Sequence, residues 1–195
     1  MKATDTKLLE QFVRSIFPLK ETEMDKFLTS WQHFECKRKT ILTTAGETER
    51  HLYFVLEGVQ RAFYLGNDNE EATIVFTYPP SFSCIVDSFL TQTPSRFFLE
   101  TLTTSRFLRT SWQQVEQLMN EHPAIQKMVL RLTAFAMKGV LERQIELQCF
   151  SAEEKFRTLL RRSPHVMQLI PHKYLASYLG MDATTFSKLL GSVRL

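Results

Sequence analysis

Hydroxyl and amino side chains that could form hydrogen bonds with a polar ligand are spaced along the C-terminal segment, residues 170–195. Residues 173–179 predict a short helix, and Gly180 permits the left-handed turn that would end it. Asp182 can cap a second helix that presents Phe186 to the first. A small side chain, a glycine turn and an apolar residue at this spacing let two helices cross closely, as a helix-turn-helix requires. The predicted inward-facing residues are Leu175, Ala176, Leu179, Phe186, Leu189 and Leu190.

The second helix of this pair carries the residues that would read DNA, because the exposed N-terminal part of such a helix enters the major groove. Lys188 could donate to a guanine edge or a phosphate, and Thr184 could reach a base edge or a thymine methyl. On the first helix, Lys173 and Tyr178 are placed for backbone contact. The candidate DNA-binding residues are Lys173, Tyr178, Ala183, Thr184, Ser187 and Lys188. Many helical hairpins share this spacing, and a solvated surface lysine is the alternative for Lys188.

The net charge of +3 is distributed unevenly along the chain. Residues 151–195 carry seven Lys and Arg side chains against three Asp and Glu, so this segment has a net charge of +4. The first 150 residues carry 17 basic and 18 acidic side chains and are therefore nearly neutral. A basic tail on a neutral body suits phosphate contact at one end of the molecule.

Short strands and a long helix must position this tail. Residues 5–31 predict two short helices, and residues 34–108 predict a series of short strands with turn residues between them, such as the Gly-Asn-Asp-Asn-Glu run at 66–70. Strands at spacings of about 8–12 residues indicate a sandwich, a roll or a small barrel. Capping-box patterns predict helix starts at Thr22, Ser111 and Ser151.

The longest predicted helix runs from residue 124 to about residue 149. A helix of that length extends roughly 40 Å, more than a roll of this size can cover. Its apolar stripe consists of Ile125, Met128, Val129, Leu132, Phe135, Ala136, Val140 and Leu147. The stripe therefore indicates a partner helix, most simply that of a second copy, and the alternative is packing against the chain's own roll. The break after this helix predicts one domain at 1–150 and a second at 151–195.

Composition excludes several classes of protein. No apolar run approaches the roughly 20 residues needed to cross a bilayer, and the N-terminal segment lacks the pattern of a signal peptide, so we expect a cytoplasmic protein without membrane contact. Cys36, Cys84 and Cys149 are too scattered for a disulfide framework, a zinc site or an iron–sulfur cluster. The five histidines are equally dispersed, which argues against the metal site of a cupin-type enzyme. No nucleophile or phosphate-loop motif is present, and we expect neither enzymatic activity nor a metal.

The order of parts resembles the Crp/Fnr family of transcription regulators, especially its short divergent members common in Bacteroidetes. The resemblance covers about residues 5–195 and rests on LYFVLEGVQRAFYL, a Gly/Asn/Asp hairpin, SFLTQTPSRFFLETL, a long helix and YLASYLGMDATTFSKL. It implies an α+β fold, in which a double-stranded β-roll of the cyclic-nucleotide-binding type with flanking helices is followed by a dimerisation helix at about 121–149 and a C-terminal helix-turn-helix. It also implies as partners a two-fold symmetric double-stranded DNA operator, a second copy of the chain, RNA polymerase and an unidentified small-molecule effector.

The sequence departs from this family at the nucleotide contacts. Cyclic-nucleotide-responsive members carry Phe-Gly-Glu and a downstream Arg that pairs with the cyclic phosphate. Here the Gly is replaced, and the Arg position falls at or beside Ser95. Arg96 is one residue late, and in a strand such a shift turns the side chain to the other face. Losing that charge-assisted contact lowers the affinity roughly tenfold or more, so we expect cyclic AMP binding to be weak or absent. We therefore expect the protein to hold no cofactor. The candidate ligand pocket consists of Phe82, Ser83, Cys84, Ile85, Asp87, Ser95 and Arg96.

The predicted recognition helix departs from the family as well. Ala183 and Thr184 stand where the best-known members carry charged base-reading residues, so no operator sequence follows from the resemblance. Lys188 replaces what is commonly an Arg and offers a point charge instead of a planar fork. The main alternative function is a ligand-sensing or protein-interaction module whose helix-turn-helix no longer binds DNA.

Overall fold

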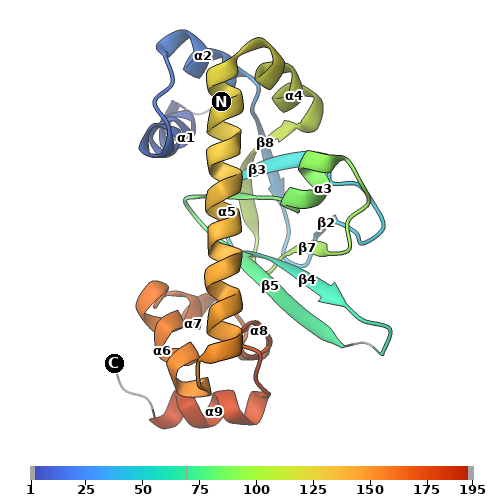
Figure 1. The fold of residues 1–195 in the computed structure, drawn as a ribbon, viewed down its shortest axis with the longest axis vertical. Coiled ribbons are helices and arrows are strands. Elements are labelled where there is room, and N and C mark those ends of the chain that lie inside the picture. Colours follow the sequence, from blue (N-terminus) through green and yellow to red (C-terminus); the bar gives the residue numbers. More distant parts are fainter. Residues whose placement is uncertain (1–2, 69, 193–195) are drawn as a thin grey trace.

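The computed structural model describes residues 3–68 and 70–192, so Asn69 of the predicted hairpin loop lies outside the described residues. A long helix, α5, runs the length of the molecule beside two sheets, with α1, α2 and α4 at one end and α6–α9 at the other (Figure 1). The helices are α1 (Ala3–Ile16), α2 (Glu21–Thr29), α3 (Val86–Thr91), α4 (Trp112–Glu121), α5 (Pro123–Cys149), α6 (Ala152–Arg162), α7 (Val166–Leu169), α8 (His172–Tyr178) and α9 (Ala183–Ser192). The strands are β1 (Gln32–Cys36), β2 (Ile41–Thr43), β3 (His51–Glu57), β4 (Gln60–Leu65), β5 (Glu71–Thr77), β6 (Ser81–Ser83), β7 (Phe98–Thr101) and β8 (Ser105–Ser111).

The strands form a roll of two antiparallel four-stranded sheets, which confirms the predicted α+β roll with flanking helices. The strand orders are β1-β8-β3-β6 and β2-β7-β4-β5. Consecutive strands β3 and β4 lie in different sheets, and the chain passes between them at Gly58 with φ +93°. A Cβ at this position would lie 2.6 Å from the carbonyl oxygen of Thr104, so a side chain has no room at the crossing.

Alternation along the strands sends side chains to two different cores. Tyr53 and Val55 of β3 point into the small interior between the sheets, whereas Phe54 points outward to the helices. There Phe54 meets Phe12 and Phe82, with ring centroids 5.4 and 5.5 Å away. The aromatic cluster fixes α1, α2 and the start of α5 on the first sheet.

A third core joins the C-terminal helices to the roll. Val59 and Leu102 of the roll belong to the same buried cluster as Phe156 of α6, Leu175 of α8 and Phe186 of α9. The Tyr78 hydroxyl also forms a hydrogen bond with the hydroxyl of Ser163 at the end of α6. The helix pair therefore packs directly on the roll, and the chain break after α5 does not separate it from the sheets.

Two of the three predicted capping boxes are confirmed, and one is wrong. Ser111 caps α4 with Gln114 as its partner, and Ser151 caps α6 with Glu154. Thr22 does not cap α2, because the helix begins at Glu21 and the carboxylate of Glu23 accepts from the backbone N–H of Lys20. The Glu23 side chain therefore moves the helix start ahead of the threonine.

Helix α5 is packed at its start and bare through its middle. Ile125 and Met128 are fully buried against the N-terminal helices, whereas residues 134–142 are exposed on every side. The large apolar side chains exposed in and around this stretch are Leu130, Phe135, Met137, Val140, Leu141, Ile145 and Leu147. Of the predicted stripe, the first part packs within the chain and Leu147 near the end lies beside Gly180, whereas Phe135, Ala136 and Val140 are exposed. The alternative that the whole helix packs on its own roll is therefore wrong.

Candidate nucleic-acid interface and roll interior

Helices α8 and α9 form the predicted helix pair, and the turn between them has the predicted chemistry. Gly180 adopts φ +62°, and the Met181 N–H donates to the Ala176 carbonyl at 3.1 Å, which closes the end of α8. Asp182 Oδ1 accepts from the Thr185 N–H at 2.9 Å and caps α9. Phe186 is 1% exposed. The two helices are thus fixed against each other by backbone and core together.

The inward face of α9 is narrower than the sequence suggests. Leu189 packs on the shared core, but Leu190 is 43% exposed, so its predicted contact with the first helix is wrong. Helix α8 has seven residues and covers only the side of α9 that carries Phe186 and Leu189.

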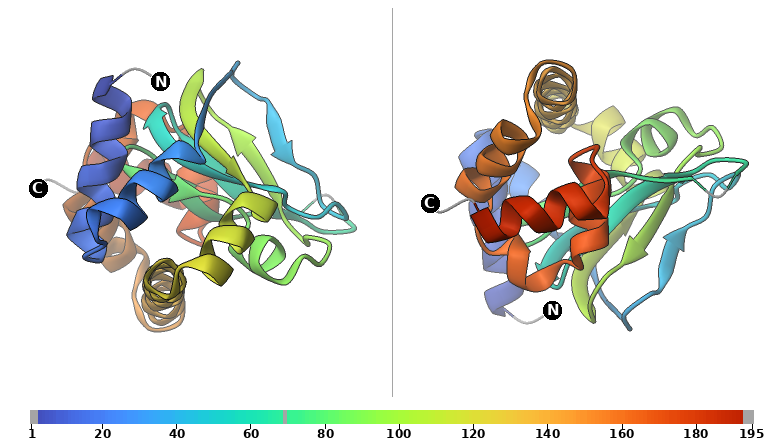
Figure 2. Two further views of the ribbon diagram at one scale, coloured as in Figure 1. Left: turned by 90° about the horizontal axis from the view of Figure 1, so that it is seen from above. Right: turned by 90° about the horizontal axis from the view of Figure 1, so that it is seen from below.

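The predicted base-reading residues lie together on the uncovered side of α9. Ala183, Thr184, Ser187 and Lys188 are all exposed. Helix α9 crosses the outer end of the molecule, with the sheets and α5 behind it (Figure 2, right). The Ser187 hydroxyl donates to the Ala183 carbonyl of its own helix at 2.8 Å. This face of α9 is open to solvent, and among its described residues, Ala183–Ser192, the one cation is Lys188.

The two candidates on α8 face the roll. The Tyr178 ring lies between Phe76 of β5, 5.2 Å away between centroids, and the guanidinium of Arg143 on α5, 4.1 Å away. Burial raises the pKa of the Tyr178 hydroxyl. Lys173 is exposed, but its ammonium lies 4.6 Å from the Tyr174 ring and helps to lower the pKa of Glu71, after the larger effect of Arg61. In this arrangement neither side chain lies on the α9 face.

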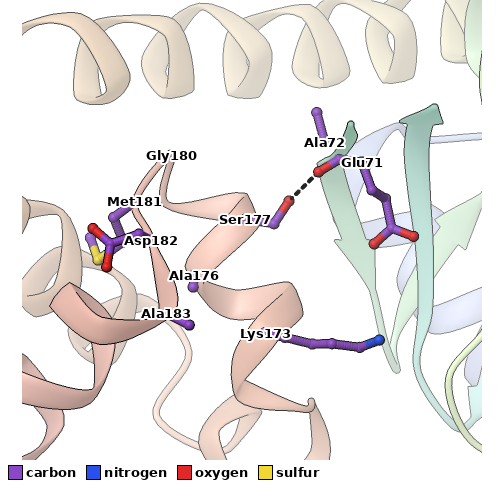
Figure 3. A pocket seen from close by; sticks show the side chains of 9 residues that line it. All are labelled: Glu71, Ala72, Lys173, Ala176, Ser177, Gly180, Met181, Asp182 and Ala183. Atoms are coloured by element: carbon purple, nitrogen blue, oxygen red, sulfur yellow. Dashed lines mark hydrogen bonds between the residues drawn. The ribbon is translucent and has the colours of Figure 1, made fainter. Parts of the chain in front are cut away.

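A cleft of about 400 Å³ separates β5 from the turn of the helix pair (Figure 3). Small side chains make most of its wall, and Glu71, Lys173 and Asp182 supply the charges. The Ser177 hydroxyl crosses from α8 to β5 at its edge (Figure 3). Ala183, predicted to face DNA, also lines this cleft, so it marks the boundary between the two surfaces.

The predicted pocket residues of the roll divide among three locations. Ser83, Ile85 and Ser95 are buried within the roll, and the Ser95 hydroxyl is bonded to both the N–H and the carbonyl of Phe97. Phe82 points the other way, into the aromatic cluster, where it stacks on Trp31 at 5.8 Å. The remaining three residues lie nearer the surface: Cys84 is half-buried, whereas Asp87 and Arg96 are exposed.

No guanidinium from this segment reaches the roll interior. Ser95 is 3% exposed, whereas the adjacent Arg96 is on the outside with its guanidinium 5.7 Å from the Tyr64 ring centroid. The sequence-based expectation that these residues lie in a strand is wrong, because Ser95 and Arg96 lie in the irregular segment between α3 and β7. The cation that would bind a phosphate is therefore directed to solvent.

Sequence reasoning missed a buried carboxylate at this place, that of Glu49. It is 1% exposed and accepts from the Thr43 hydroxyl at 2.5 Å, the His51 N–H at 3.1 Å and the Ile85 N–H at 3.3 Å. Burial raises its pKa despite these hydrogen bonds. In the sequence Glu49 stands in the polar run before β3, where nothing distinguishes it from a surface residue.

Comparison with known proteins identifies the architecture. Residues 33–122 match the family model of the cyclic nucleotide-binding domain. FixK2 from Bradyrhizobium japonicum superposes with a TM-score of 0.76 at 15% identity, over 83% of each chain. A Crp/Fnr transcriptional regulator from Eubacterium rectale superposes with a TM-score of 0.68 at 15% identity, over 91% of this chain and 86% of the other. The chain has the Crp/Fnr fold.

The resemblance to the Crp/Fnr regulators is thereby confirmed at the level of the fold. The c-di-GMP-responsive regulator CLP from Xanthomonas campestris shares the Crp/Fnr fold with a TM-score of 0.68 at 14% identity, over 88% of this chain and 90% of the other. No curated protein sequence matches the chain. Within residues 3–68 and 70–192, no three His, Cys, Asp or Glu side chains are grouped to hold a metal ion, and no helix is long and apolar enough to cross a membrane.

The raised pKa of Glu49 predicts how stability depends on pH. The folded state binds this proton more tightly than the unfolded chain, so the cost of the buried charge is fully present above the folded pKa and vanishes below the ordinary value of 4.5. Relative to Glu49→Gln, the wild type should therefore lose free energy of unfolding as the pH rises from 4.5 toward neutrality. Urea unfolding of both proteins across this range measures the difference.

The matched control is Glu47→Gln, which neutralises an exposed carboxylate two positions away. Its stability difference from the wild type should vary much less with pH. A Glu49→Gln difference that stays constant across the range would show that burial does not raise this pKa.

Proposed function

We propose that this chain is a DNA-binding transcription regulator, in which residues 1–150 form a roll with a dimerisation helix and residues 151–195 form the DNA-binding part. The observation that carries the proposal is the exposed face of α9 at the free end of a Crp/Fnr fold. That face combines small and hydroxyl side chains with Lys188, a set that fits base edges, thymine methyls and phosphates. We propose no enzymatic role.

The bare middle of α5 supports pairing of two copies. Leu130, Met137, Leu141 and Ile145 are spaced at seven, four and four residues and therefore lie along one side of the helix, all more than half exposed. Apolar side chains at this spacing are typical of helices that pack on a partner helix. A two-fold axis along this stripe would present two copies of α9 to a symmetric operator.

We propose further that the regulator does not respond to cyclic AMP. A phosphate placed in the roll would meet the buried carboxylate of Glu49 and would lack the guanidinium of Arg96, which is outside. The buried carboxylate therefore opposes an anion in the roll, and the cation of this segment is placed where it cannot bind one. We propose as further partners the unidentified small-molecule effector and the RNA polymerase that the resemblance implies.

Isothermal calorimetry tests the claim about cyclic nucleotides directly. The 195-residue chain should bind neither cyclic AMP nor cyclic GMP more tightly than about 1 mM, because Arg96 is outside the roll and the buried carboxylate of Glu49 repels an anion. A dissociation constant in the micromolar range for either nucleotide would contradict this proposal.

Selection from a randomised DNA library followed by a gel-shift salt titration tests the function itself. The wild type should enrich a two-fold symmetric site, and Lys188→Ala should lower affinity for it by roughly tenfold. If Lys188 meets a phosphate, the salt slope should also fall by about one. The control is Lys26→Ala, which removes an exposed lysine from α2 at the opposite end of the molecule and should leave affinity unchanged.

The alternative module without DNA binding gives a different result in the same experiment. It would enrich no sequence, and its salt slope would match that of generic DNA binding. Unchanged operator affinity in Lys188→Ala would remove the role given to this lysine.

A further inference from the structure

Strand β5 is an edge strand, and its outer side carries unpaired backbone groups. It pairs with β4 on one side only. An exposed sheet edge is a ready template for unwanted pairing, so proteins cover it. Here α8 covers it. At that place the carbonyl of Glu71 and the N–H of Thr73 both face the helix, two residues apart on the same edge.

A single hydroxyl satisfies both of these groups. The Thr73 N–H donates to Ser177 Oγ at 2.9 Å. The Ser177 hydroxyl donates to the Glu71 carbonyl at 3.1 Å, the bond drawn as a dashed line in Figure 3. A neighbouring strand would fill the same two positions with one residue's N–H and carbonyl. Ser177 on the helix thus replaces the backbone N–H and carbonyl of a strand residue. A hydroxyl can do this because its one oxygen both donates and accepts a hydrogen bond.

The buried side chain of Arg61 contacts α8 one turn before Ser177, at Tyr174. The Arg61 guanidinium of β4, 2% exposed, is held between the rings of Phe63 at 4.1 Å and Tyr174 at 3.7 Å. Its nitrogens donate to Glu71 at 2.6 and 3.0 Å and to Glu100 at 2.6 Å. With both carboxylates and both rings in place, the position of Tyr174 on the sheet is closely determined.

Whatever fixes α8 also fixes α9. The two helices share the core that includes Ala176 and Phe186, and the Gly180 turn between them is closed by backbone hydrogen bonds. On the other side, the Arg143 guanidinium of α5 donates to the Tyr178 carbonyl. The orientation of α9 therefore follows from where α8 sits on β5.

We propose that Ser177 is a positioning residue, whose hydroxyl fixes the helix pair on the edge of β5 and thereby orients α9 for DNA. This inference rests on the proposed DNA binding, and it assigns to the roll a specific contact that sets how the recognition helix is presented. Ser177 contacts no DNA itself in this account. Its effect reaches DNA through the fraction of molecules in which α9 has the binding orientation.

Hydrogen exchange tests the contact without DNA. In Ser177→Ala the Thr73 amide loses its acceptor and should exchange at least about tenfold faster, whereas Ser177→Thr keeps the hydroxyl and should retain protection. The matched control is Ser192→Ala, which deletes a hydroxyl that bonds only to its own helix. Unchanged Thr73 exchange in Ser177→Ala would overturn the proposal.

Operator affinity tests the consequence. Ser177→Ala should bind the selected operator about tenfold more weakly, because α9 is less often in the binding orientation. Binding to generic DNA should stay the same, because the substitution removes no side chain that contacts a phosphate. Ser177→Thr should restore most of the affinity. Faster Thr73 exchange with unchanged or tighter operator binding would overturn the positioning role. If the wild type selects no operator, the proposed function fails, and the exchange result still decides whether the contact exists.

Discussion

The length of α5 sets the constraint on which the rest of the structure depends. Its 27 residues extend well past the surface that the roll and the N-terminal helices can cover. Residues 134–142 are exposed all round and include Phe135, Met137 and Val140. Burying such side chains stabilises a protein by about 1.5–3 kcal/mol each, so leaving this many in water is unfavourable. In the proposed dimer, a second copy would supply the missing surface and bring two copies of α9 into one assembly.

Pairing of two α5 helices would fix the spacing of two α9 helices only if α8 and α9 are held firmly on the roll. The edge of β5 holds them there. Backbone groups that no strand satisfies are taken up by the hydroxyl of Ser177, and the buried Arg61 binds two carboxylates and two rings around Tyr174. The interior of the roll has by contrast kept an anion of its own, Glu49. The roll matches the cyclic nucleotide-binding domain, and the buried carboxylate of Glu49 is the basis of our proposal that it does not take such a ligand.

Local chemistry was predictable from the sequence, and long-range contacts were not. Gly180, the Asp182 cap and the buried Phe186 follow from rules that span a few residues, and all three are observed. The misplaced residues depend on partners far away in the chain: Tyr178 was assigned to DNA, but it packs on Phe76. Ser177 and Thr73 are 104 residues apart, and no periodicity in the sequence links them. Thr22 shows that local rules also fail, since α2 begins at Glu21 and the Glu23 carboxylate accepts from the Lys20 N–H.

The most direct measurement is the oligomeric state of the wild type and of Met137→Glu by sedimentation equilibrium. The wild type should be a dimer at micromolar concentration, and a charge in the centre of the exposed stripe should make it a folded monomer that no longer binds a two-fold operator. Thr22→Glu adds the same charge on α2 and should remain dimeric. A monomeric wild type, or a Met137→Glu variant that stays dimeric, would contradict pairing through α5.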